Sequence, residues 1–253
     1  MPRTAGRRGV RESHAAHLLL SQFRLPVAGP PSSGDVTMGL QAWTMLGNDV
    51  YGDCGPAATM HCRMAKALVS VDAGVPSFEA GFAPPTTAGT EALYFAYGRA
   101  MQEPGTPPDQ GVANATWLEF CYRQGVVEWY GELDPSDPDE VHAAMLACRG
   151  VLVAVRLPAD AEAQFEAHEP WSIDGAGIAG GHDILLVRYS PDADTFVTWG
   201  ALQEATVNWD ALCITDAWAF GTKEDAGRAG FTFAAIKQTI DAAGATVVGE
   251  ETQ

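Results

Sequence analysis

Positive charge is scarce in this sequence. The 253 residues include 15 Lys and Arg against 32 Asp and Glu, which gives a formal net charge of −17 at pH 7. Because an acidic surface repels phosphate backbones, we expect the main body not to bind nucleic acid. Long apolar runs are also missing: no stretch approaches the roughly 18 residues of a membrane span, and no apolar block of signal-peptide length follows the start. We therefore expect a soluble, cytoplasmic protein without a membrane partner.

Cysteines are few, odd in number and without a CxxC pair, which argues against a disulfide framework and favours a reducing compartment. No His/Cys group has the spacing of zinc ligands, and the pair His14 and His17 has no further ligands beside it. The sequence therefore predicts no metal and no cofactor. The five cysteines are Cys54, Cys62, Cys121, Cys148 and Cys213.

The few basic residues are concentrated at one end of the chain. Residues 1–30 hold five arginines and a single acidic residue, so a basic arm precedes an acidic body. We divide the chain into a basic N-terminal arm (1–35), a main domain (36–221) and a C-terminal helical extension (222–253). Such an arm is typical of a disordered tail; the alternative is docking onto an acidic surface, in self-association or in a virion assembly.

A Gly- and Asp-rich loop, residues 46–53, leads into an apolar segment that runs to about residue 71. Small and apolar residues recur there at helical spacing, which predicts a helix beginning at Cys54. Asp53 suits the N-cap and Pro56 the first turn. A thiol at a helix N-terminus lies near the positive end of the helix dipole, so we expect its thiolate to be favoured.

A thiolate nucleophile also needs a base, and His182 is the candidate. It follows two glycines and opens an apolar, β-branched run that ends at Tyr189. Cysteine before a helix, followed more than a hundred residues later by histidine at the start of a strand, is the chain order of papain-like peptidases. Each residue also has a plainer interpretation: Cys54 as a small buried hydrophobe, and His182 as a turn residue.

Three segments together resemble the papain-like cysteine peptidase superfamily: 52–57 (GDCGPA), 180–182 (GGH) with its strand, and 197–200 (VTWG). They are most similar to the branch that cuts bacteriocin leaders after double glycine, and to uncharacterised papain-like proteins of actinobacteria and their phages. The resemblance implies an α+β fold, in which a helical half carries Cys54 and an antiparallel sheet half carries His182, with the active-site cleft between the halves.

The resemblance also assigns roles to other residues. The residue six positions before the nucleophile supplies an oxyanion-hole amide, and here that residue is Asn48. The family has Asn or Asp before the Trp-Gly segment, where this chain has Val197 and Thr198. Thr198 is expected to orient the imidazole only weakly. Asp183, Asp192 and Asp194 are alternatives, if the fold brings one of them near. The plain alternative for Asn48 is an ordinary turn residue.

Periodicity predicts the remaining elements of the domain. We expect loops over 73–89 and a Gly-rich rim over 169–181. Helices are expected over 14–23, 91–101, 112–123, 139–148, 208–213 and 231–243, and strands over 151–155, 183–189, 195–199 and 216–220.

Two functions of different classes follow from these residues. The first is hydrolysis of a peptide or amide bond in a peptide or protein substrate, with Cys54 as nucleophile, His182 as proton carrier and Asn48 at the oxyanion. The second is a catalytically weak or inactive papain-like module that serves as a structural or binding component of a phage particle or other assembly. The missing Asn or Asp at 197–198 favours the second. An acyl transfer of the transglutaminase type shares the dyad and is not distinguished from hydrolysis.

Overall fold

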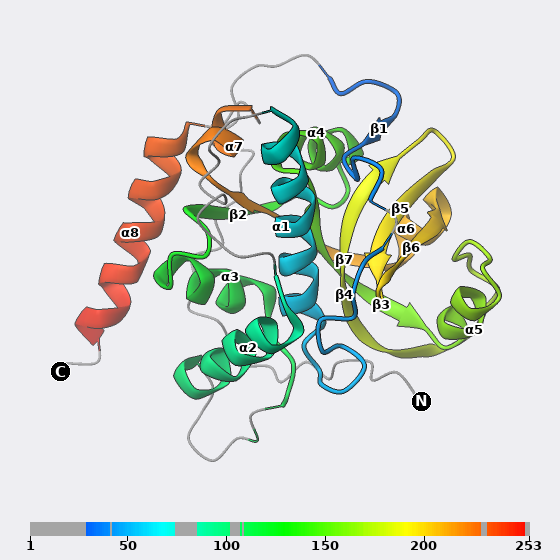
Figure 1. Cartoon of the computed structure of the whole chain (residues 1–253), viewed down its shortest axis with the longest axis horizontal. Helices are drawn as coiled ribbons and strands as arrows, with labels where there is room; N and C mark the ends of the chain where they lie inside the picture. The colour runs from blue at the N-terminus through cyan, green and yellow to red at the C-terminus, as the bar shows by residue number, and fades with distance from the viewer. Residues whose placement is uncertain are drawn as a thin grey trace.

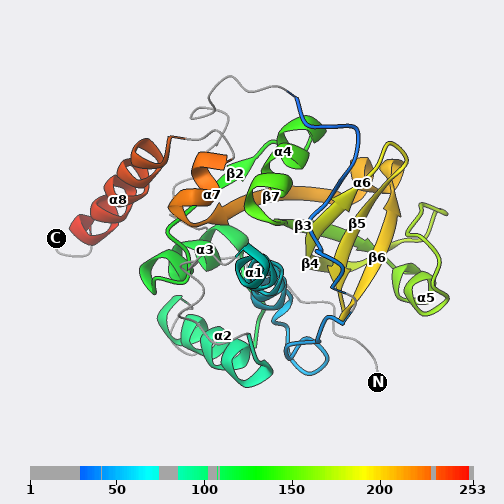
Figure 2. The same ribbon diagram turned by 45° about the horizontal axis from the view of Figure 1, so that its top comes forward.

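Helix α1 (Cys54–Ala73) crosses the centre of the molecule and separates a helical half from a sheet half (Figure 1). Helices α2 (Thr87–Met101) and α3 (Asn114–Arg123) lie on one side of α1, and the sheet lies on the other (Figure 2). The fold is therefore α+β with the two halves that the sequence predicts. The computed structural model describes residues 29–40, 42–73, 85–101, 107, 109–228 and 232–250.

The sheet half is antiparallel in every pairing of its strands. Among the described residues the strand order is β2, β7, β3, β4, β5, β6, with β1 also paired to β4. The β-branched run that begins at Val151 lies in β3 and is fully buried, as its composition predicts. The strands are β1 (Gly34–Asp35), β2 (Trp129–Leu133), β3 (Val151–Pro158), β4 (Ile178–Tyr189), β5 (Ala193–Thr198), β6 (Ala201–Thr206) and β7 (Ile214–Gly221).

Aromatic side chains fill the helical half. Trp117 of α3 is completely buried, and its Nε1 donates a hydrogen bond to Oγ1 of Thr59 in α1 at 2.8 Å. Its ring stacks on Phe120 and meets Tyr97 of α2 edge-on, at centroid distances of 5.9 Å and 5.6 Å. These side chains are core, as predicted, and they fix α1 against α2 and α3.

Helix α4 (Pro138–Cys148) shows how the sequence sets local structure. Asp137 accepts a hydrogen bond from the backbone N–H of Glu140 at 3.1 Å, and Pro138 occupies the first turn, where its missing N–H costs nothing. At the other end Arg149 adopts a left-handed φ of 64°, which terminates the helix. The three shorter helices are α5 (Ala161–Glu166), α6 (Val207–Cys213) and α7 (Lys223–Arg228).

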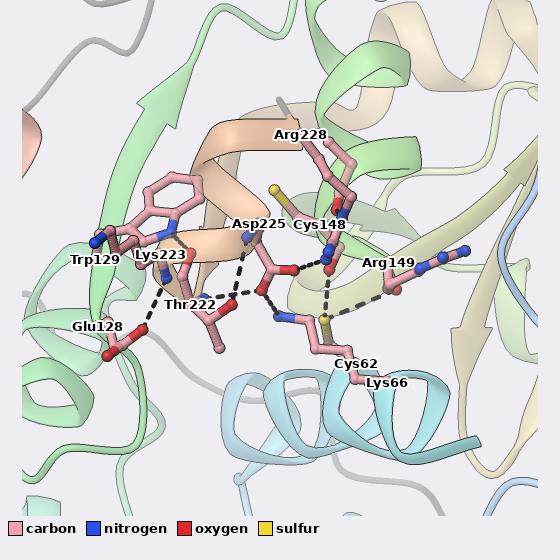
Figure 3. Close-up of polar contacts among 11 residues, drawn as sticks. Cys62, Lys66, Glu128, Trp129, Cys148, Arg149, Thr222, Lys223, Asp225 and Arg228 are labelled. Atoms are coloured by element: carbon pink, nitrogen blue, oxygen red, sulfur yellow. Dashed lines mark hydrogen bonds and ion pairs between the residues drawn. The ribbon is translucent and has the colours of Figure 1, made fainter. Parts of the chain in front are cut away.

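The C-terminal extension packs on the body. Figure 3 shows Lys66 of α1 and Arg228 of α7 converging on the carboxylate of Asp225. The Lys66 Nζ lies 2.9 Å from Asp225 Oδ2, and the side chains of Lys66 and Asp225 are 8% and 2% exposed. Helix α8 (Phe233–Glu250) buries Ile236 and Ile240. The extension therefore contributes to the core of the domain.

Four segments differ from the sequence prediction. The predicted rim over 169–181 contains the start of β4, because residues from Ile178 onward pair with β3 despite their glycines. Strands β2 and β6 were not predicted: Gly131 and Glu132 interrupt the apolar pattern of β2, and pairing with β7 overrides this weak local preference. Helix α2 begins at Thr87, within the predicted loop.

Some sequence predictions fall on residues outside the described part of the chain, namely the helix over 14–23 and the pair His14 and His17. None of the helices in the described part of the chain is long and apolar enough to cross a membrane. Within those same residues, no three His, Cys, Asp or Glu side chains gather in a way that could hold a metal ion.

Candidate active site

Cys54 is the first residue of α1 and is buried, with 4% of its surface exposed. The carbonyl of Asp53 accepts a hydrogen bond from the backbone N–H of Ala57 at 2.8 Å, so Asp53 does occupy the N-cap position. Both of its carboxyl oxygens are buried without a hydrogen-bond partner in the described part of the chain. The predicted capping by the Asp53 side chain is therefore absent.

The sulfur of Cys54 faces a carboxylate. Sγ lies 3.6 Å from Oδ2 of Asp183 in β4. Burial raises the pKa of the thiol well above its usual value, and the negative charge of Asp183 raises it further, against a smaller lowering by the backbone N–H groups of Asp183 and Gly55. The expectation of a stabilised thiolate is therefore wrong, because burial and the neighbouring carboxylate outweigh the helix N-terminus.

Asp183 is held in place by Asn114, the first residue of α3. The Asn114 Nδ2 donates to Oδ1 of Asp183 at 3.0 Å and to Oδ1 of Asp216 in β7 at 3.1 Å. Gly55 leaves room for this carboxylate under α1: a Cβ there would lie 2.5 Å from Cγ2 of Val112 and 3.2 Å from Oδ2 of Asp183. Asn114 was missed at the sequence level because nothing in its surroundings distinguishes it from an ordinary helix-start residue.

His182 lies in a buried aromatic and hydroxyl environment. Its Nε2 is 2.8 Å from Oγ1 of Thr198, and its ring stacks on Trp199 at a centroid distance of 5.1 Å and an angle of 26°. Burial lowers the pKa of the imidazole to about 4. Its Nδ1 is buried and has no hydrogen-bond partner among the described residues.

The turn between β5 and β6 places Trp199 beside the imidazole. Thr198 pairs with Ala201, and the two residues between them have positive φ, 47° for Trp199 and 75° for Gly200. Positive φ at both central residues is the pattern of a type I′ hairpin turn, which usually selects Asn and Gly. The backbone of a tryptophan is strained at such a φ, and backbone strain of this kind is found most often at functional sites.

Cys54 and His182 are not hydrogen-bonded to each other in the described part of the chain, although Asp183, the residue after His182, reaches the sulfur. His182 and Asp183 are consecutive in β4 and pair in register with Val155 and Ala154 of β3, so their side chains point to opposite faces of the strand. Asp183 takes the face toward α1. In the described part of the chain the structure thus brings Asp183, rather than the imidazole, into hydrogen-bond distance of the sulfur.

Asn48 is buried in the loop before α1, at 3% exposure. Its side chain lies beside Asp53, where it lowers the pKa of that carboxyl, although burial dominates and raises the value to about 8. Of the aspartates considered as a third triad member, Asp194 pairs with His142 at 3.1 Å and Asp192 is exposed. The hydrogen-bond partner of the His182 imidazole is therefore Thr198, at Nε2.

No family model matches the sequence, and no curated protein gives a significant match. Among solved structures, xylellain, a cysteine protease from Xylella fastidiosa, is similar over 86% of this chain and 91% of its own, with a TM-score of 0.54 and 12% identity. The fold is papain-like. The cysteine protease CMS1MS2 of Carica candamarcensis is similar over 76% of this chain and 99% of its own, with a TM-score of 0.42 and 12% identity. The similarity to xylellain shows a papain-like fold and nothing finer, because the sequence identity is 12%.

Proposed function

We propose that this protein hydrolyses a peptide or amide bond with Cys54 as nucleophile and His182 as proton carrier. The observation that supports this most is the setting of His182. Nε2 is tied to Thr198 and the ring lies against Trp199, while Nδ1 has no hydrogen-bond partner among the described residues. An imidazole fixed at one nitrogen and unengaged at the other is arranged to take up a proton.

In the proposed reaction, Sγ of Cys54 attacks the carbonyl carbon and its proton passes to Nδ1 of His182. Because Asp183 faces Sγ and His182 points to the other face of β4, this transfer requires β4 to rearrange at its start so that the imidazole turns toward α1. The proton then moves to the leaving nitrogen, and water hydrolyses the thioester with His182 as base. The backbone N–H of Cys54 and the side chain of Asn48 are proposed to stabilise the oxyanion. Because the Asn48 side chain lies beside Asp53, this role requires it to turn toward the substrate.

The resting pair is neutral in this proposal. The pKa of the thiol is raised and the pKa of the imidazole is lowered to about 4, so the proton stays on sulfur at neutral pH. Substrate binding then has to bring the imidazole against the thiol, and His182 acts as a general base rather than as half of a preformed ion pair. We infer from the resemblance to leader peptidases that small residues precede the scissile bond.

One observation favours a second function, that of a papain-like module without hydrolysis. Oδ2 of Asp183 lies 3.6 Å from Sγ of Cys54 and disfavours the thiolate. In this case the domain is a binding or structural component of a larger assembly, such as a phage particle, with the basic arm (1–35) docking on an acidic partner surface. The five buried cysteines form no disulfide, which fits residence in the cytoplasm in either case.

Alkylation and hydrolysis distinguish the two functions. We expect the protein to cleave members of a fluorogenic peptide library, with loss of at least about a hundredfold in both Cys54→Ser and His182→Ala. Iodoacetamide should modify Cys54 at a rate that falls in His182→Ala, whereas Cys213 serves as the internal reference thiol. Absence of cleavage, together with Cys54 alkylation that is unaffected by His182→Ala, would favour the inert module.

A further inference from the structure

A cavity of about 340 Å³ opens between α4, α6 and the sheet. None of Cys54, His182 and Asn48 lines it, so it is separate from the candidate active site. Its volume is at the lower end of the range for small-molecule pockets. Exposed residues form the mouth, namely Pro135, Ser136, Pro138, Val207 and Ala211, and the buried Val153 and Ala217 belong to its inner wall.

One side of the cavity carries a fixed imidazole and carboxylate. The Nε2 of His142 in α4 lies 3.1 Å and 3.3 Å from the two carboxyl oxygens of Asp194 in β5. The ring of His142 stacks on Tyr189 with a centroid distance of 3.9 Å and an angle of 3°. Stacking and the hydrogen bond together hold both side chains in one orientation.

Asp210 of α6 supplies a second carboxyl group to the same cavity. Both of its oxygens are buried, and neither has a hydrogen-bond partner in the described part of the chain. Burial raises the pKa of Asp210 to about 9, and the charge of Asp194 adds to this. Buried polar groups are normally hydrogen-bonded. A buried carboxyl without a partner in a cavity wall therefore suggests that a ligand in the cavity supplies the hydrogen-bond donor.

We propose that this cavity binds an alkylguanidinium group, with the planar head between Asp194 and Asp210. A guanidinium presents several N–H donors in a flat fork, which suits two carboxyl groups that approach from different elements. The apolar walls formed by Val141, Val153 and Ile214 fit the methylene stem. The ligand is therefore a free alkylguanidine or the arginine side chain of a peptide.

Calorimetric titration of the full chain tests this proposal. The probes are butylguanidinium, its neutral isostere butylurea, and the blocked peptide N-acetyl-Ala-Arg-Ala-amide. We expect butylguanidinium to bind at least tenfold more tightly than butylurea, and binding should shift the methyl resonances of Val153 and Ile214. Tighter binding of the peptide would identify peptide arginine as the natural source; weaker binding would identify a free guanidine.

Two variants complete the test. Asp210→Asn should weaken butylguanidinium binding about tenfold or more, because the carboxyl that ionises against the bound cation is replaced by a neutral amide. Asp192→Asn, an exposed residue of the β4–β5 turn, should leave the affinity unchanged. Asp210→Asn removes no hydrogen bond within the described residues, and circular dichroism verifies its folding. Equal binding of butylurea, or full affinity in a folded Asp210→Asn protein, would overturn the proposal.

Discussion

Two buried carboxyl groups in this molecule have opposite surroundings. Asp225 is 2% exposed and lies between two cations, Lys66 and Arg228, with a further hydrogen bond from the backbone N–H of Thr222 at 2.8 Å. Asp183 is 7% exposed and lies against an amide and the thiol of Cys54. The first arrangement forms ion pairs that fasten α7 to α1, whereas the second raises the pKa of a candidate nucleophile.

The largest loss of stability should come from removing a cation from the cluster of Lys66, Arg228 and Asp225. Lys66→Met removes one cation from Asp225 and should lower the free energy of unfolding by about 3 kcal/mol, because it leaves a buried carboxylate partly compensated. Urea denaturation measures this. The control is Lys237→Met, which breaks an ion pair to Asp241 whose side chains are 47% and 52% exposed, and should cost less than about 1 kcal/mol. Equal losses of free energy of unfolding in the two variants would show that the buried ion pair stabilises the protein no more than the exposed pair does.

Asp210 extends the comparison to a carboxyl without any cation in the described part of the chain. The pKa of Asp210 is about 9 in the folded protein, against 3.8 for an ordinary aspartate in the unfolded chain. Between these two pH values the unfolded chain therefore binds fewer protons than the folded protein. The free energy of unfolding consequently falls as the pH rises from about 4 to 9. Asp210→Asn removes this penalty and should stabilise the protein by at least about 2 kcal/mol at pH 8, since each pH unit between these two pKa values adds up to about 1.4 kcal/mol. The gain should vanish near pH 4. Urea denaturation at pH 4, 6 and 8 measures it, and a gain independent of pH would contradict this account.

The charge of Asp183 should control the reactivity of the Cys54 thiol. Asp183→Asn keeps an oxygen for the amide of Asn114 but removes the charge beside Sγ, so the pKa of Cys54 should fall and alkylation by iodoacetamide at pH 7.5 should accelerate about tenfold. Asp216→Asn is the matched control, because Asp216 accepts from the same amide. A similar acceleration in both variants would point to loosening of the structure rather than to charge.

The sequence predicted the fold because its local signals agree with one another. A helix beginning at Cys54, the capped helix α4 and the β-branched run of β3 each depend on nearby residues, and the structure confirms all three. The predicted hairpin of β4 and β5 is likewise paired. Strand β2 could not be predicted, since its pairing with β7 depends on residues about ninety positions away.

The electrostatics of the site were less predictable than its composition. The helix N-terminus is a local feature and indicates a lowered thiol pKa, but burial and the position of Asp183 depend on tertiary packing. Strand alternation could have suggested that His182 and Asp183 face opposite sides. Which of the two faces α1 depends on the register with β3 and on the contact with Asn114, which no short pattern encodes.

The smallest predicted effect concerns the hydrogen bond at the imidazole. For Nδ1 of His182 to accept a proton, Nε2 must carry hydrogen and donate it to Thr198 Oγ1, 2.8 Å away. Thr198→Val removes this acceptor, so the tautomer with the proton on Nδ1 becomes competitive and the rate of peptide cleavage should fall about fivefold, as for a neutral hydrogen bond of about 1 kcal/mol. Thr198→Ser should restore the rate, and nitrogen-15 chemical shifts of His182 report the tautomer directly. A rate loss in Thr198→Val without a tautomer change would assign Thr198 a packing role only.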